Sequence, residues 1–530
     1  IQWKQLWARV ESAHAGDDLV VLVTPVTRPT QPVKMVVESA LYWNRPGALA
    51  KVSDSQLRAE LPERTINVYS TAPHVEDFYV KTQTPYLVLR LDGPVGLSTG
   101  SPRTVDEIRK LIEAQREKLE SAATAHGVLA EAFIAVEAGL AWNVIYEPRL
   151  DRVVSTVGRL WNEEYGGYCL FGWDNFFLAY MSSLYDRDLA LANVIEHLRG
   201  ATDEGFIPND NRGNGSKSWD RSQPPVGSIT VREIFKKYPE RWLLEATFDD
   251  LLAWNRWWVT RRFNEGLLSY GSHEADNPFD EPATRSKRTA GYESGMDDSP
   301  MYEGVPFSKE KNTLELQDVG LTSLVIADSL ALAEMGDVLG RDSQAQELRD
   351  RARSLAANME RLWDEETGLY LNRRTDTGKL SRRLSPTLFY PLLGGVPTQE
   401  RAQRMVTDHL LNRDEFWGDW IIPSIARSDP AFPKQRYWKG AIWPPLNVLT
   451  YLSLRRAGFH HPASELADKS LTLLLREWQR QGYVSENYSS ITGTGDDERL
   501  SSDRFHSWGA LMGIMAFIES NTMPAPEDAP

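Results

Sequence analysis

The spacing of apolar residues changes near residue 100, and this change constrains the fold more than any other feature of the chain. From residue 104 onward, apolar residues recur at spacings of three and four, which is the pattern of amphipathic helices. About ten such stretches follow, at residues 104–125, 127–141, 177–198, 242–263, 313–336, 343–363, 399–411, 441–457, 464–478 and 507–518. Alternating inner and outer helices around a ring would bury these apolar stripes. The pattern therefore predicts a mainly α domain with close to six helix pairs.

Residues 1–100 follow a different pattern. Short stretches rich in Val and other strand formers, at 18–25, 33–39 and 86–91, are separated by Pro, Gly and Asn. This pattern predicts antiparallel β-structure. We therefore expect two domains, an N-terminal β-domain at residues 1–100 and a helical domain at residues 101–530.

Composition narrows the classes of partner. A net charge of −15 argues against nucleic acid and against an anionic membrane surface, so a neutral substrate fits better. The apolar runs are too short to cross a bilayer, and no membrane span is expected. The one cysteine, Cys169, excludes an internal disulfide and a multi-cysteine metal site. The compartment stays open: the start at Ile1 is expected either from removal of a leader, which would fit a secreted or periplasmic location, or from trimming of the chain.

Two acidic segments carry the strongest functional signal: Glu-Ser-Gly-Met-Asp-Asp at 293–298 and Glu-Asn-Tyr at 486–488. Each lies among aromatic and polar residues, the setting in which a glycosidase holds a proton donor and a base that activates water. In this interpretation Asp297 is the general acid, with a pKa raised by burial and by the charges of Glu293 and Asp298. Glu486 is the general base. The alternatives are solvated loops, or a structural calcium ion held by the carboxylates of the first segment or of the acidic stretch at 493–498. No other cofactor is expected.

Three further segments place aromatic rings beside polar groups. Asp174 stands just before a predicted helix, where it either caps that helix or binds sugar hydroxyls while the neighbouring Trp173 ring covers the sugar. Gln223 offers a donor and an acceptor to a hydroxyl, although a plain structural turn is the simpler interpretation of its Pro-rich segment. Trp438 and Trp443 flank a turn and form either a platform for a sugar or part of the core.

Taken in order, these segments resemble the motifs of glycoside hydrolase family 63, whose clan includes the trehalases. The matching residues are Trp-Asp-Asn-Phe-Phe at 173–177, Ser-Gln-Pro-Pro at 222–225, Glu-Ser-Gly-Met-Asp-Asp-Ser-Pro at 293–300, Tyr-Trp-Lys-Gly-Ala-Ile-Trp-Pro at 437–444 and Glu-Asn-Tyr at 486–488. The resemblance implies an (α/α)6 barrel and an inverting glycosidase with Asp297 as acid and Glu486 as base. It also implies a set of substrate-binding residues: Trp173, Asp174, Gln223, Tyr437, Trp438, Trp443 and Tyr488.

Two departures from the family pattern bear on the substrate. Trehalases carry an Arg shortly before their Trp-Asp pair, and residues 166–172 contain none. The N-terminal segment is similar to that of the larger bacterial α-glucosidases of the family, whereas the small glycerate-glycoside hydrolases lack a β-domain of this size. We therefore expect an exo-acting, inverting α-glucosidase that hydrolyses a neutral di- or oligosaccharide or another glycoside.

Other functions stay open at this point. A mannosylglycerate or glucosylglycerate hydrolase would need a basic partner for the glycerate carboxylate, and Arg436 and Lys439 are the candidates. A barrel that binds carbohydrate without turnover, a lyase and a phosphorylase on a similar helical ring are the remaining alternatives. The sequence shows no HExxH, P-loop or dinucleotide-binding motif, so few other chemistries compete.

Overall fold

The computed structural model describes residues 2–3, 6–27, 32–41, 45–161, 166–275 and 284–525. The chain forms two compact units, residues 1–130 with 148–151, and residues 131–147 with 152–530. The first unit extends past residue 100 because helix α1 (Val105–Thr124) packs against strands β2 (Leu6–Ala15) and β3 (Asp18–Pro25). That residues 1–100 form a domain by themselves stays a prediction.

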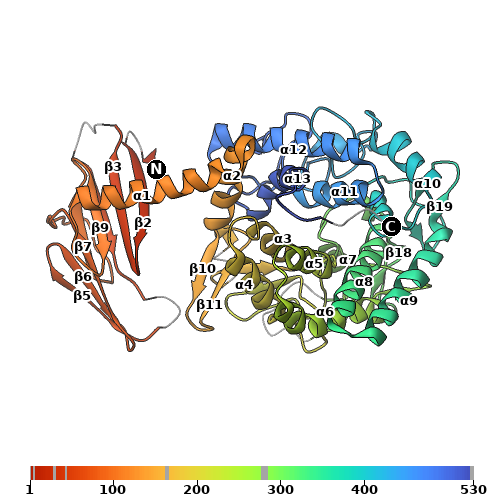
Figure 1. Ribbon diagram of the computed structural model, residues 1–530, viewed down its shortest axis with the longest axis horizontal. Coiled ribbons are helices and arrows are strands. Elements are labelled where there is room, and N and C mark those ends of the chain that lie inside the picture. The colour runs from red at the N-terminus through yellow and green to blue at the C-terminus, as the bar shows by residue number, and fades with distance from the viewer. Residues whose placement is uncertain are drawn as a thin grey trace. The chain divides into compact units, whose positions relative to one another are not determined.

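An antiparallel sheet of seven strands forms most of the first unit, in the order β1-β2-β3-β9-β7-β6-β5 (Figure 1). Strands β4 and β8 pair separately as a two-stranded sheet. The remaining strands of the unit are β1 (Gln2–Trp3), β4 (Lys34–Glu38), β5 (Ala48–Ser53), β6 (Gln56–Glu60), β7 (Thr65–Ser70), β8 (Tyr86–Arg90) and β9 (Val95–Thr99). The stretches expected to be strands correspond to β3, β4 and β8.

Apolar side chains of β3 point to both faces of this sheet, so both faces are apolar at this strand. Val20 and Leu22 pack in a cluster with Ile108 and Ile112 of α1. Val23 belongs to a second cluster, which it shares with residues of β6, β8 and β9. Because successive side chains of a strand point to opposite faces, a run of apolar residues along one strand can serve both clusters.

The second unit is mainly helical, and its helices fall into two classes by burial. Five are buried along most of their length: α3 (Gly172–Ser182), α5 (Gly227–Lys237), α8 (Val319–Leu339), α11 (Pro444–Arg456) and α13 (Leu511–Glu519). Others expose one face: α4 (Arg187–Leu198), α6 (Arg241–Arg261), α9 (Asp342–Met359) and α12 (His460–Gln481). Contacts join α3 to α4, α8 to α9 and α11 to α12. In Figure 1, α3, α5 and α11 lie nearer the middle of this unit than α4, α6 and α12.

Short elements complete the second unit. Its other α-helices are α2 (Ala130–Ala141), α7 (Lys287–Glu293) and α10 (Gln399–Arg404), which continues as a π-helix over Met405–Leu410. Its antiparallel strand pairs are β10 (Val144–Glu147) with β11 (Arg152–Ser155), β12 (Cys169–Phe171) with β13 (Asp210–Arg212), β14 (Phe263–Asn264) with β15 (Leu267–Leu268), β16 (Phe307–Ser308) with β17 (Thr313–Leu314), β18 (Leu316–Gln317) with β21 (Arg373–Arg374), and β19 (Trp363–Asp364) with β20 (Leu369–Tyr370).

Capping side chains explain where the helix expectations hold and where they are wrong. Thr104 caps α1 in a reciprocal capping box, which agrees with the predicted start at residue 104. The prediction of a single helix at 177–198 is wrong. Two helices occupy this stretch because the Asp186 side chain accepts a hydrogen bond from Leu189 N and starts α4. Helices α5 and α7 were not expected.

Helix α8 is the one described helix that is long and apolar enough, by length and composition, to cross a membrane. In the second unit, however, 89% of its most apolar window is buried, and it packs against α5, α6 and α9. Its apolar composition is therefore accounted for by packing inside the protein.

Candidate active site

A cavity of about 430 Å³ in the helical unit collects residues from all five sequence motifs. Eight of the nine predicted site residues line it: Trp173, Asp174, Gln223, Asp297, Tyr437, Trp438, Trp443 and Glu486. The ninth, Tyr488, does not. The cavity therefore brings together side chains that lie up to about 300 residues apart in the sequence.

Asp297 follows helix α7 in a turn that closes tightly against Trp173. Gly295 makes this turn possible, because its φ of +67° favours glycine and a Cβ there would lie 2.7 Å from the Trp173 ring. The Asp297 carboxylate reaches the cavity and accepts a hydrogen bond of 3.4 Å from Tyr437 Oη. Burial, followed by the charge of Asp298, raises the pKa of Asp297 to about 7. A carboxyl group in this state can hold a proton near neutral pH.

Glu293, which was expected to raise the pKa of Asp297, instead belongs to a fully buried ion pair. Its two carboxylate oxygens accept hydrogen bonds from Arg262 Nε at 2.7 Å and Arg262 Nη2 at 2.8 Å. They also accept from Ser222 N at 3.0 Å and Gly271 N at 2.6 Å. One carboxylate thus ties three separate segments together behind the cavity.

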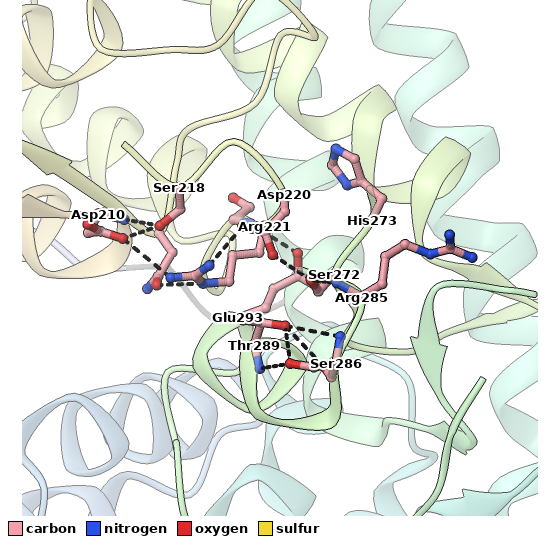
Figure 2. A network of polar contacts seen from close by, with 12 residues as sticks. Asp210, Ser218, Asp220, Arg221, Ser272, His273, Arg285, Ser286, Thr289 and Glu293 are labelled. Atoms are coloured by element: carbon pink, nitrogen blue, oxygen red, sulfur yellow. Dashed lines mark hydrogen bonds and ion pairs between the residues drawn. The ribbon is translucent and has the colours of Figure 1, made fainter. Parts of the chain in front are cut away.

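A polar network next to this pair positions Arg221, which lines the cavity (Figure 2). Arg221 donates to Asp220 Oδ1 at 2.7 Å and to Asn209 Oδ1 at 3.0 Å, and its Nη2 lies 3.5 Å from Asp210 Oδ1. Ser272 Oγ in turn donates to Asp220. The positive charge of Arg221 opposes the rise in the pKa of Asp297, but burial and Asp298 outweigh it.

Glu486 lies beyond the end of α12, with 6% of its surface exposed, and therefore is not a solvated loop residue. Oε2 accepts from Asp503 N and from Asn487 Nδ2, both at 3.3 Å. Trp508 Nε1 donates to the backbone carbonyl of Glu486 at 3.0 Å. Burial, then the charge of Asp503, raises the pKa of Glu486 well above its usual value, with smaller contributions from Asp174 and Asp297. The three cavity carboxylates therefore interact electrostatically.

Aromatic rings form one wall of the cavity. The rings of Trp438 and Trp443 stack with centroids 3.8 Å apart, and Trp173 lies 6.3 Å from Trp438. Asp298 holds the turn that carries them, since it accepts from Trp438 N at 3.1 Å and pairs with Lys439. These rings are almost fully buried and also line the cavity; that they form a platform for a sugar stays a prediction.

The remaining predicted residues divide into those at the cavity and one in the core. Asp174 does not cap α3, whose N-cap is Phe171; its buried carboxyl lines the cavity, and burial raises its pKa well above the usual value. Gln223 Oε1 accepts from Trp173 N at 3.2 Å and so holds that segment in place. Tyr488 packs in an apolar cluster, because its backbone pairs with Ile442 on the core side of the site.

Several cavity residues were missed by sequence reasoning, namely Arg212, Arg221, Arg288, Tyr292, His506 and Trp508. Arg288 is exposed, donates to Tyr292 Oη at 2.5 Å and has no carboxylate partner within the described ranges 166–275 and 284–525. Its segment, 264–292, contained no recognisable motif, and residues 276–283 lie outside the described residues. The only sequence signal for Arg288 as a cavity residue was its position four residues before Tyr292.

The calcium ion considered from the sequence has no support in the described acidic segments. Glu293 pairs with Arg262, Asp298 with Lys439 and Asp496 with Arg480. Within the part of the chain that the structure describes, no group of three or more His, Cys, Asp or Glu side chains is arranged to hold a metal ion.

A family model and several known proteins match this chain. The family model described as "Mannosylglycerate hydrolase MGH1-like glycoside hydrolase domain" matches residues 167–508. A mannosylglycerate hydrolase from Thermus thermophilus is 24% identical over 55% of this chain and 76% of its own length. A mannosyl-oligosaccharide glucosidase from Arabidopsis thaliana is 22% identical over 67% of this chain and 47% of its own length.

The fold of a solved relative agrees as well. The crystal structure of a family 63 mannosylglycerate hydrolase from Thermus thermophilus, in complex with glucose, superposes with a TM-score of 0.59 at 20% identity. The superposed region covers 73% of this chain and 99% of the Thermus thermophilus chain. For four matched mannosylglycerate hydrolases, the share of their own length that this chain covers runs from 48% to 76%.

Proposed function

Because the chain belongs to glycoside hydrolase family 63, through its MGH1-like glycoside hydrolase domain, we propose that it is an exo-acting, inverting α-glucosidase that hydrolyses a di- or oligosaccharide. One observation carries the proposal: Asp297 and Glu486 line the same cavity, and Asp297 has a pKa of about 7. A carboxylic acid that keeps its proton near neutral pH suits a general acid. Burial raises the pKa of Glu486 as well, so its assignment as the base rests on its place in the last motif and in the cavity, not on its pKa. The helical unit is proposed to be an (α/α)6 barrel.

In the proposed reaction, Asp297 donates its proton to the glycosidic oxygen as the bond to the anomeric carbon breaks. Glu486 removes a proton from the water that attacks the opposite face of that carbon. Inversion of configuration follows, because a single displacement occurs without a covalent intermediate. The Tyr437 hydroxyl, which donates to Asp297, orients the acid.

The sugar at the cleaved end is proposed to lie against the aromatic wall. The rings of Trp173, Trp438 and Trp443 offer apolar faces for a pyranose. Asp174 accepts hydrogen bonds from its hydroxyls, and Gln223 contributes through its amide. Among the described residues, His506 lies 4.0 Å from Asp174 and is neutral, so Asp174 is not paired with a cation. Because Oε1 of Gln223 accepts from Trp173 N, its amide NH2 is the group that would donate to a hydroxyl.

A second candidate is a hydrolase of mannosylglycerate or glucosylglycerate. Arg288 favours it, since this guanidinium lines the cavity without a carboxylate partner among the described residues and would pair with a glycerate carboxylate. The partners suggested by the sequence are less suitable. Lys439 pairs with Asp298, and Arg436 is exposed and does not line the cavity. Several relatives that match this chain carry the name mannosylglycerate hydrolase.

A panel of α-linked disaccharides, aryl α-glucosides, mannosylglycerate and glucosylglycerate separates these candidates. We expect turnover of an α-glucoside, with β-glucose as the first product seen by NMR. Asp297→Asn and Glu486→Gln should each lower kcat by about 10²- to 10⁴-fold. Exclusive turnover of the glycerate glycosides would favour the second candidate. Sugar binding without any turnover would favour an inactive carbohydrate-binding barrel, and turnover that requires phosphate would indicate a phosphorylase.

A further inference from the structure

His506 lies in the cavity between two of its carboxylates, although it belongs to none of the five motifs. The side chain is 3% exposed. Its Nε2 is 4.0 Å from Asp174 Oδ1 and 3.9 Å from Glu486 Oε1. The ring packs against the Trp508 ring with centroids 4.9 Å apart, which fixes its orientation. Nε2 is thus held at nearly equal distance from both carboxylates.

The surroundings of the ring assign its proton. Nδ1 is buried and has no hydrogen-bond partner among the described residues. A buried N–H without an acceptor is rarer and more costly than a buried lone pair without a donor, so the proton belongs on Nε2. Burial also lowers the pKa of His506 to about 3, so the ring is neutral at ordinary pH. It presents one N–H toward Asp174 and Glu486.

The two oxygens of Glu486 have different surroundings. Oε2 accepts hydrogen bonds from Asp503 N and Asn487 Nδ2. Oε1 faces His506 and accepts no hydrogen bond from the described residues. Oε1 is therefore the oxygen available to take a proton. A distance of 3.9 Å between Nε2 and Oε1 is too long for a direct hydrogen bond, but one oxygen atom about 2.8 Å from each of them bridges it.

We propose that His506 Nε2–H holds the water that attacks the anomeric carbon. This inference rests on the proposed function, in which Glu486 is the general base. The water oxygen accepts from Nε2–H with one lone pair and directs the other at the anomeric carbon, while Glu486 Oε1 receives the water proton. As the new C–O bond forms, the glycosidic C–O bond breaks and its oxygen takes the proton of Asp297. His506 keeps its own proton throughout.

Two substitutions at one position test this role. His506→Leu removes the donor, whereas His506→Gln places an amide N–H close to the position of Nε2. We expect His506→Leu to lower kcat by about 10- to 100-fold with KM within about threefold, because one hydrogen bond to the reacting water is lost. His506→Gln should recover most of this activity. His409→Leu, which removes a largely buried His that does not line the cavity, is the matched control and should retain full activity.

Two substrates test whether the loss of kcat in His506→Leu arises from the attack of water and not from protonation of the leaving group. Fluoride leaves without a proton from Asp297, so Asp297→Asn should hydrolyse α-glucosyl fluoride at close to the wild-type rate. His506→Leu should show the same loss of kcat on this substrate as on the parent glucoside. A 6-deoxy-α-glucoside should show the same His506→Leu defect as the parent glucoside. Loss of that defect with the 6-deoxy substrate, or a defect confined to KM, would mean that His506 binds a sugar hydroxyl instead.

Full activity of His506→Leu in an enzyme whose wild type hydrolyses α-glucosides would overturn the role of His506 alone. A wild type that hydrolyses no glycoside in the panel would overturn the proposed function and this inference with it. If His506→Leu does not fold, as judged by circular dichroism, His506→Asn replaces it. Its shorter amide lies near Nδ1 rather than Nε2, so it should be as defective as the Leu variant, and wild-type activity in it would refute the assignment.

Discussion

Replacing Arg262 by Met would leave the Glu293 carboxylate without its cation in a site with no exposed surface. Both side chains are 0% exposed, and two hydrogen bonds of 2.7 and 2.8 Å join them. Met keeps much of the aliphatic packing of Arg262 against the Trp257 ring. Among the residues that the structure describes, Glu293 would retain only two backbone donors, Ser222 N and Gly271 N. The substitution also removes the hydrogen bond from Arg262 Nη2 to Asp220 O, but that carbonyl keeps the hydrogen bond from His273 N, so the main loss is the charged partner of Glu293.

Two estimates of the cost agree. Removing one member of a buried ion pair typically costs about 3–5 kcal/mol. The stranded carboxyl can instead take a proton, which costs about 1.4 kcal/mol for each pH unit above its unfolded pKa of about 4.3, or at most roughly 3.7 kcal/mol at pH 7, because the intact pair with its raised Glu293 pKa already bears part of this cost. We therefore expect Arg262→Met to lower the free energy of unfolding by about 3–4 kcal/mol at pH 7.

The pH dependence distinguishes this explanation from a simple packing defect. Burial already raises the pKa of Glu293 in the intact pair, despite Arg262, and the variant raises it further. A carboxyl group whose pKa is higher in the folded state binds its proton more tightly there, so stability falls as the pH rises from the unfolded pKa through the folded one. The difference between wild type and variant should therefore grow between pH 5 and pH 8.

Urea unfolding followed by Trp fluorescence at several pH values measures this difference. Arg353→Met is the matched control, because Arg353 pairs with Asp350 on the exposed face of α9 and should change stability by less than about 1 kcal/mol. A loss in Arg262→Met that stays constant from pH 5 to pH 8 would refute the assignment to a stranded carboxyl. A loss below 1 kcal/mol would show that the pair contributes little.

Three further predictions concern the site. In the wild type, kcat/KM should fall as the pH rises through about 7, where Asp297 loses its proton. Asp298→Asn removes a neighbouring negative charge, so the fall in kcat/KM should occur at a lower pH. A fall at the same or a higher pH would contradict the role of Asp298 in raising the pKa of Asp297. Gly295→Ala should lower kcat at least tenfold, since its Cβ would meet the Trp173 ring; steady-state kinetics with near-normal activity would show that the turn tolerates a side chain. Tyr488→Phe should leave KM for an α-glucoside within twofold, because Tyr488 lies outside the cavity, and a large rise in KM would return it to the binding site.

The cavity residues could be predicted where short motifs carry both chemistry and local geometry. Gly295 and Asp297 stand two residues apart because the glycine conformation forms the turn that presents the carboxylate. Glu293 shows the limit of such reasoning. Its proximity in sequence suggested an electrostatic effect on Asp297, yet its side chain points to Arg262, which no motif includes. Distance along the chain does not determine which group a side chain faces.

The sequence by itself determined the order of strands before helices, the family to which the chain belongs and eight of the residues that line the cavity. These follow from local periodicity and from motifs whose members lie within a few residues of one another. Only the tertiary structure decided that Tyr488 packs in the core, that Arg262 neutralises Glu293 and that His506 lies between Asp174 and Glu486. The reason is physical: burial and charge pairing act between groups that are distant in sequence, so packing alone determines which of them meet.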